Sequence, residues 1–192
     1  MVILRLTASL AKRMKVKLQP SDQSSSTRLG DWYAIDIVLS RNQFILCVSS
    51  KSRLAVVLEA APYATLPDRL SDAVTEVLKE IGVNEGMIQE ERTEMEQVFL
   101  AKTLNKSILG TMNDYRLQFE WADQADKFKL EETLKMLMYL NKTISLALPE
   151  GYPRDSALKL FGQEPLKSKA VNPAIVEKPT ENQRPRLYVV KS

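Results

Sequence analysis

The amino-acid sequence predicts an α+β fold: a mainly antiparallel sheet of four to five strands, covered by helices, with an extended C-terminal tail. Between residues 32 and 59, short apolar runs rich in β-branched and aromatic residues alternate with polar breaks, a pattern typical of strands joined by turns. Elsewhere apolar residues recur every three to four positions, which is typical of helices with one buried face.

The run between residues 32 and 59 predicts a meander of three strands. Within Tyr33–Leu39, apolar side chains recur at every second position, as in a strand with one buried face. The runs Phe44–Val48 and Leu54–Leu58 are apolar throughout. Such strands lie in the middle of a sheet or have both faces covered, so we expect helices on this sheet. The short breaks favour antiparallel neighbours.

The residues before the meander predict one strand, one helix and a loop. Val2–Leu6 fits a strand, and Thr7 can cap a short helix over Ala8–Met14. The segment Pro20–Gly30 is polar and rich in serine, which predicts a flexible loop.

Helices are expected to dominate the second half of the chain. After Pro62, Thr65 and Asp68 resemble a capping box, and apolar residues within Leu70–Ile81 predict a helix that ends at Gly82. The remaining expected elements are a short helix over Asn84–Arg92, a strand within Met95–Thr103 that also fits helical spacing, a helix from Ser107 to Ala122, a helix lined by Leu130, Leu134 and Leu137, and a short helix over Arg154–Phe161.

The composition fits one core with an appendage. The chain has 192 residues, of which 44% are hydrophobic, enough for a single domain over residues 1–162 with a tail over residues 163–192. One cysteine and no histidine are present, which fits a reducing compartment. No apolar run is long enough to span a bilayer. We therefore expect a bacterial-type cytoplasmic protein that does not enter the membrane.

One block of the sequence resembles a known pattern. The segment Lys102–Asp114 reads K-T-L-N-K-S-I-L-G-T-M-N-D, and it is similar to the N-[KR]-S-x-L-G-[ST]-M-N-D hallmark of an uncharacterised bacterial domain family of unknown function. Ile3–Thr7, Gly30–Ala34 and Leu140–Thr143 also resemble that family. The resemblance covers Met1–Gly162 and implies a shared fold unit without implying an activity.

The polar residues of this block are the first candidate for a ligand or docking site. If a helix begins at Ser107, free backbone N–H groups together with Lys106 can hold an anion, and Gly110 permits close approach of another backbone. The same residues also fit a structural role, in helix capping and in hydrogen bonds to nearby loops. The candidate residues are Asn105, Lys106, Ser107, Gly110, Asn113 and Asp114.

A second candidate surface lies near the N-terminus, where five basic residues precede the first acid, Asp22. A basic edge of this kind can bind nucleic acid, and it is also typical of a solvated helix face. Trp32 and Tyr33 can stack on a base if they are exposed, or they can close one end of the core. The basic residues are Arg5, Lys12, Arg13, Lys15 and Lys17.

The C-terminal tail is the third candidate. Prolines at positions 165, 173, 179 and 185 exclude a continuous helix, and residues 163–192 carry six basic and three acidic side chains. An extended segment with a β-prone end can add a strand to a partner's sheet, although it can also pack on its own domain or stay disordered. The expected partner-binding residues are Arg184, Arg186, Leu187, Tyr188, Val189 and Val190.

These features favour a non-enzymatic protein-binding module. We expect the antitoxin or accessory component of a bacterial toxin–antitoxin or phage-defence locus, with a protein partner such as a cognate toxin. The alternatives are a nucleic-acid-binding protein that uses the basic N-terminal helix, and an enzyme with a site in Asn105–Asp114. Without histidine, acid–base catalysis near neutrality needs a strongly shifted carboxylate or lysine. No cofactor is expected, and Asp36, Glu59 and Asp114 lack the spacing of a metal site.

Overall fold

The computed structural model describes residues 1–18, 20–39, 42–125, 137 and 139–165. Five strands form one sheet in the order β4-β3-β2-β1-β5. The elements in chain order are β1 (Val2–Leu6), α1 (Ala8–Met14), β2 (Trp32–Leu39), β3 (Asn42–Ser49), β4 (Ala55–Glu59), the 3₁₀ helix η1 (Tyr63–Thr65), α2 (Leu66–Ile81), α3 (Glu85–Glu94), β5 (Val98–Lys102), α4 (Lys106–Ala125) and α6 (Pro153–Leu160).

The predicted α+β fold with a mainly antiparallel sheet is confirmed. Strands β2, β3 and β4 form the expected meander, with Tyr33 opposite Val48 and Leu46 opposite Val57. Strand β1 pairs in parallel with both β2 and β5, a detail that no short-range pattern predicts. Parallel neighbours require long connections, and here the chain between β1 and β2 includes α1 and a long loop.

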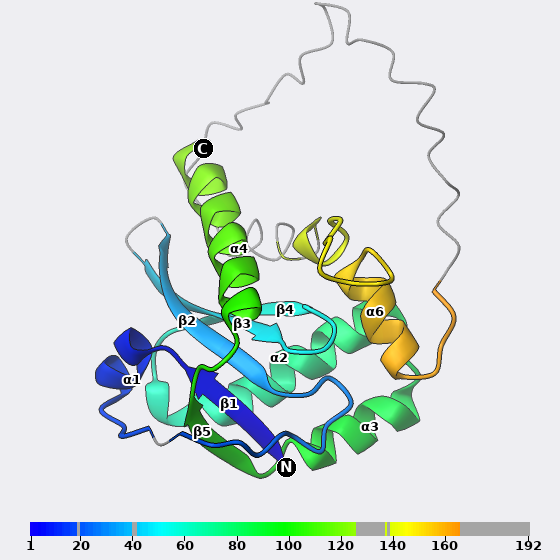
Figure 1. Ribbon diagram of the computed structural model, residues 1–192, viewed down its shortest axis with the longest axis horizontal. Coiled ribbons are helices and arrows are strands. Elements are labelled where there is room, and N and C mark those ends of the chain that lie inside the picture. Colours follow the sequence, from blue (N-terminus) through cyan, green and yellow to red (C-terminus); the bar gives the residue numbers. More distant parts are fainter. Residues whose placement is uncertain (19, 40–41, 126–136, 138, 166–192) are drawn as a thin grey trace, which may run out of the picture.

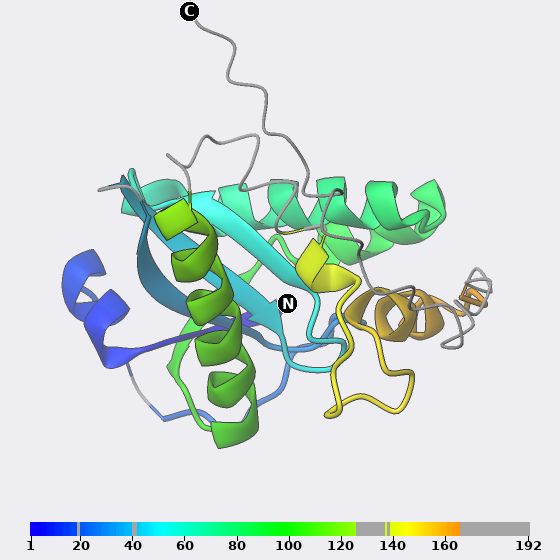
Figure 2. The same ribbon diagram turned by 90° about the horizontal axis from the view of Figure 1, so that it is seen from above.

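Helices cover both faces of the sheet. Helix α4 packs against β2 and β3, whereas α2 packs against β4 and α3. Viewed from above, α4 lies on one face of the sheet and α2 runs across the other (Figures 1 and 2). In this three-layer arrangement β3 contacts α4 and β4 contacts α2, which fits the apolar character of both strands.

Most helix ends follow the predicted capping residues. Thr7 accepts a hydrogen bond from the backbone N–H of Leu10 at 3.4 Å, and Gly82 ends α2 with a φ of 90°. The predicted capping box at Thr65 is wrong, because the Thr65 hydroxyl donates to the carbonyl of Pro62 and not toward the helix. Helix α2 instead continues directly from the 3₁₀ turn η1.

The core explains the aromatic residues that begin the meander. Trp32 and Tyr33 are both buried, so they close the core and neither is free to stack on a base. Cys47 is buried in β3, and burial raises the pKa of its thiol to about 12. Its thiol therefore stays protonated at neutral pH, as expected for a core residue. Within the described ranges, no helix has the length and apolarity to cross a membrane.

A buried amide fastens the edge strand β4. The side chain of Asn141 is inaccessible to solvent. Its Oδ1 accepts from the N–H of Ala55 at 2.8 Å, and its Nδ2 donates to the carbonyl of Ala55 at 3.0 Å. Asn141 thus acts like a further strand residue beside β4. Most of the helix predicted around Leu130–Leu137 lies outside the described residues.

Candidate functional site

Helix α4 begins one residue earlier than predicted, and Asn105 is its cap. The Asn105 Oδ1 accepts from the N–H groups of Ser107 at 2.9 Å and Ile108 at 3.3 Å. These are the backbone donors that the sequence analysis assigned to an anion. Because Asn105 already satisfies them, the hypothesis of an anion held by free helix amides is wrong, and the structural role of Asn105 is realised.

The remaining polar residues of the block lie on a solvent-exposed stripe, the outer face of α4. The opposite stripe, with Ile108, Met112 and Phe119, is buried. Gly110 is exposed, and a Cβ at this position would meet nothing within 4 Å, so internal packing does not require glycine here. The outer face consists of Lys106, Gly110, Asn113, Asp114, Leu117 and Trp121.

Two large apolar side chains on this face were missed by the sequence analysis. The side chain of Trp121 is 66% exposed and that of Leu117 is 41% exposed. They lie one helical turn apart and continue the line from Gly110 and Asp114 at spacings of three and four. The side chains of Asn113 and Asp114 form no hydrogen bond or ion pair with the other described residues. The outer face therefore combines two exposed apolar side chains with two exposed polar side chains.

A second group that the sequence analysis missed surrounds the first turn of α4. Arg53 lies in the connection between β3 and β4 with a φ of 58°, and its side chain is only 7% exposed. Its Nη2 donates to the Ser107 hydroxyl at 3.2 Å. Its Nε and Nη1 are buried and have no hydrogen-bond partner in the described part of the chain. Burial lowers the pKa of this guanidinium.

Two buried phenols lie beside this arginine. The Tyr115 hydroxyl donates to the Arg53 carbonyl at 3.4 Å, and burial raises the pKa of Tyr115 to about 12. Burial also raises the pKa of Tyr33, a shift that the backbone amides of Leu104 and Asn105 oppose. Both phenols are therefore neutral at pH 7, and neither neutralises the charge of Arg53.

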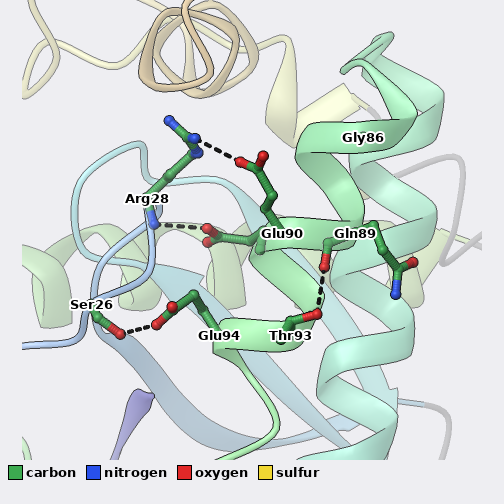
Figure 3. Close-up of a pocket in the computed structure, with 8 residues that line it drawn as sticks. Ser26, Arg28, Gly86, Gln89, Glu90, Thr93 and Glu94 are labelled. Atoms are coloured by element: carbon green, nitrogen blue, oxygen red, sulfur yellow. Dashed lines mark hydrogen bonds and ion pairs between the residues drawn. The ribbon is translucent and has the colours of Figure 1, made fainter.

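A hollow of about 830 Å³ lies between α3 and the loop before β2. Its acidic side chains point at that loop (Figure 3). Glu91 accepts from the backbone N–H groups of Arg28 at 2.7 Å and Leu29 at 3.1 Å, while Glu90 pairs with the Arg28 guanidinium at 2.9 Å. Glu94 accepts from Ser26 and pairs with the N-terminal ammonium. These carboxylates fasten the loop.

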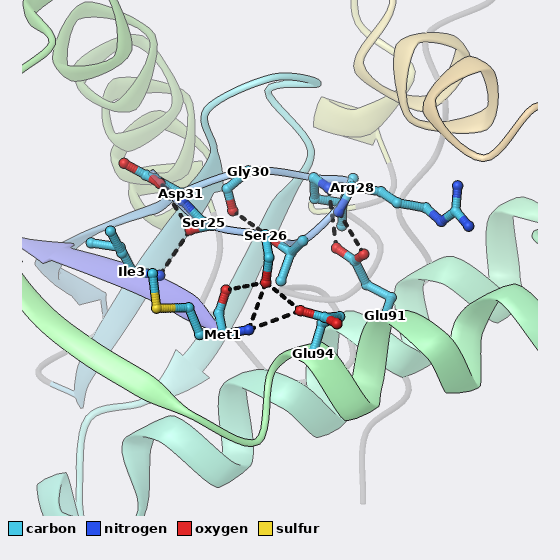
Figure 4. A network of polar contacts seen from close by, with 11 residues as sticks. Met1, Ile3, Ser25, Ser26, Arg28, Gly30, Asp31, Glu91 and Glu94 are labelled. Atoms are coloured by element: carbon cyan, nitrogen blue, oxygen red, sulfur yellow. Dashed lines mark hydrogen bonds and ion pairs between the residues drawn. The ribbon is translucent and has the colours of Figure 1, made fainter. Parts of the chain in front are cut away.

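The same loop is held from its other side (Figure 4). Asp31 accepts from the N–H and hydroxyl of Ser25 at 2.9 and 2.8 Å, and the Ser25 hydroxyl accepts from the N–H of Ile3. Asp31 also pairs with Arg5, Oδ2 to Nε, at 2.6 Å. The prediction of a flexible loop over Pro20–Gly30 overlooked these anchors, which are far apart in sequence.

This network corrects the nucleic-acid hypothesis at one position. Arg5 is 3% exposed, and it also donates to the backbone carbonyls of residues 21, 23 and 102. It is a structural residue and cannot contact a ligand. Arg13 pairs with Asp36 at 3.0 Å. Lys12, Lys15 and Lys17 are exposed, as predicted for a solvated or ligand-binding edge.

The expected tail contacts Arg184, Arg186 and Leu187–Val190 lie outside the described residues. In the described part of the chain, no group of three or more His, Cys, Asp or Glu side chains could hold a metal ion.

Comparisons with known proteins return one match. A family model described as "Domain of unknown function (DUF6933)" matches residues 3–156. No curated protein and no solved structure matches the chain. The match bears out the expected resemblance to an uncharacterised family. The role of Asn105–Asp114 as that family's hallmark and the bacterial origin stay predictions.

Proposed function

The chain belongs to the DUF6933 family, a domain of unknown function, and we propose that it is a protein-binding module that docks its partner on the outer face of α4. The observation that carries this proposal is the exposure of Leu117 and Trp121 beside the exposed polar side chains of Asn113 and Asp114. Tryptophan is enriched among the residues that dominate binding energy at interfaces.

The chemistry of this face defines the partner surface that fits it. An apolar pocket on the partner would fit Trp121 and Leu117, because their burial removes apolar surface from water. Asp114 calls for a basic group or a donor beside that pocket, and Asn113 for a donor–acceptor pair such as a peptide unit. At Gly110 nothing projects from the helix, so a partner backbone can approach α4 closely.

We further propose that the C-terminal tail completes the contact. Its prolines keep the backbone extended, and Leu187–Val190 can add a strand to the edge of the partner's sheet. A folded body with an extended arm suits the antitoxin half of a toxin–antitoxin pair, so the proposed partner is a toxin encoded by an adjacent gene. The absence of histidine from the chain favours binding over acid–base catalysis.

A pull-down of the adjacent gene product with the full chain tests the proposal. Trp121→Ala and Leu117→Ser should weaken capture, whereas Leu146→Ser is the matched control, since Leu146 is an apolar side chain outside α4 that is 99% exposed. Val189→Asp in the full chain tests the tail separately. Capture that both outer-face variants leave unchanged would contradict docking on α4, and capture unaffected by Val189→Asp would contradict the arm.

A second candidate function is nucleic-acid binding. It is favoured by the exposure of Lys12, Lys15 and Lys17, and by a hollow of about 390 Å³ that Lys12 and Lys102 line. Each phosphate contact should make the affinity fall with salt. Replacing the three N-terminal lysines by glutamine should then weaken binding to a DNA or RNA oligomer and flatten its salt dependence. Binding that is absent, or insensitive to these changes, removes this candidate.

A further inference from the structure

Arg53 combines three features that cost folding free energy. Its backbone has a φ of 58°, in the left-handed region that side chains other than glycine and asparagine rarely adopt. Its guanidinium is buried, which disfavours the charged form. Two of its nitrogens, Nε and Nη1, lack a hydrogen-bond partner in the described part of the chain. Buried polar groups without partners are rare, and they call for an explanation.

The protein does not neutralise this charge from within its described residues. None of their carboxylates forms an ion pair with Arg53; the ion pairs of the other arginines involve residues 5, 13, 28, 92, 116 and 154. The groups that influence it, Tyr33 and Tyr115, are neutral phenols. The position is therefore a buried positive charge that no described carboxylate neutralises.

The third guanidinium nitrogen of Arg53 connects it to the start of α4. Its Nη2 lies 3.2 Å from the Ser107 hydroxyl, and Ser107 is exposed. The backbone N–H of Ser107 is already capped by Asn105, so the hydroxyl and not the helix amide is the available donor. Lys106, the exposed residue that precedes Ser107, adds a second positive charge next to it in the chain.

We propose that Arg53 and Ser107 form a binding site for an oxyanion, the carboxylate or phosphate group of a ligand. A guanidinium matches the two oxygens of either group, and charge-assisted hydrogen bonds of this type are the strong ones. The Ser107 hydroxyl donates a further bond to the anion, and the neighbouring Lys106 supplies positive charge. The inference does not depend on docking at Trp121, which lies at the other end of α4.

The test uses the full chain with inorganic phosphate, acetate and chloride as probes at equal ionic strength. Phosphate or acetate should raise the thermal unfolding midpoint in a saturable manner relative to chloride, and should shift the amide resonance of Ser107. A response to phosphate alone identifies a phosphate site, and a response to acetate alone identifies a carboxylate site. Responses to both identify the shared oxyanion chemistry.

Variants assign the response to this site. Arg53→Gln and Ser107→Ala should each lower the affinity for the anion at least tenfold. Arg92→Gln, which removes an exposed arginine paired with Asp72, should leave this affinity unchanged. If Arg53→Gln does not fold, Ser107→Ala decides, because it removes only one exposed hydroxyl. The proposal is overturned if neither probe gives a saturable response, or if Ser107→Ala retains the full affinity. Because the outer-face variants at Leu117 and Trp121 lie elsewhere on α4, the two proposals fail independently.

Discussion

Replacing Trp121 by alanine should separate binding from folding. A tryptophan side chain contributes about 200 Å² of surface, and 66% of that of Trp121 is exposed in the free protein. Complete burial in a partner therefore removes about 130 Å² from water, which is worth about 3 kcal/mol at 25 cal/mol per Å². The expected loss of affinity in Trp121→Ala is about a hundredfold.

The same substitution should affect folding less. The buried third of the side chain covers about 70 Å², worth about 1.7 kcal/mol at the same coefficient. Alanine recovers about 0.5 kcal/mol of this through its higher helix propensity. The net loss of unfolding free energy is therefore about 1 kcal/mol, measurable by urea denaturation and smaller than the expected effect on binding.

Tryptophan fluorescence provides a direct assay, since the chain has only two tryptophans. Trp32 is inaccessible to solvent, so a soluble quencher should act mainly on Trp121. Addition of the adjacent gene product should protect Trp121 from the quencher and shift its emission to shorter wavelength. In Trp121→Phe the quenchable fluorescence should disappear, which would assign it to Trp121. Unchanged quenching in a complex that forms demonstrably would refute the assignment of this face.

Three further substitutions test the polar groups that position these surfaces. Arg5→Gln should destabilise the protein by about 3–5 kcal/mol in urea denaturation, because it leaves the Asp31 carboxylate buried without its partner. Asn141→Ala should cost about 2–3 kcal/mol, because both backbone groups of Ala55 lose a buried hydrogen bond. Burial raises the pKa of Glu91 above its ordinary value of 4.5. The folded state therefore holds this proton more tightly than the unfolded state, and the stability from Glu91 should fall as pH rises above 4.5. Glu91→Gln should flatten that dependence in urea titrations at pH 4 and 7.

Each of these expectations has an outcome that contradicts it. Arg5→Gln with wild-type stability would mean that the loop before β2 is held by other contacts. If the unfolding free energy of Asn141→Ala lies within about 0.5 kcal/mol of the wild-type value, the two hydrogen bonds of Asn141 contribute no more than an ordinary surface side chain. A Glu91→Gln variant whose stability changes with pH as steeply as the wild type would place the titrating group elsewhere.

The meander was predictable because its signal is local. Alternation within β2 and the two apolar runs determine strand type and neighbours through short turns. The position of β1 was not predictable in this way, because its parallel partners come from segments far along the chain. The ordering of the loop before β2 depends on the pairing of Arg5 with Asp31 and of Glu91 with the backbone of Arg28. A serine-rich composition carries no sign of such distant contacts.

The candidate surfaces differ in the same respect. Helical spacing from Gly110 and Asp114 leads to Leu117 and Trp121. The outer face is therefore predictable from the sequence by the same spacing that predicts the buried face. Arg53 had no comparable signal. It follows a polar break, and nothing in Ser49–Ser52 marks the next residue as buried with a positive φ. Only the approach of α4 to the connection between β3 and β4 reveals it.

Two features of the described body, one beside helix α4 and one on it, are not explained by folding alone. Arg53, buried and without an anion among the described residues, raises the free energy of the native state beside one end of the helix, and the exposed Trp121 leaves apolar surface in water near the other end. Either cost is removed by a ligand or partner that binds the folded state, which would then gain stability in proportion to occupancy. The sequence alone directed attention to the tail, but the body holds its own unsatisfied groups. They predict that ligands of α4 raise the unfolding midpoint of the protein even when the tail makes no contact.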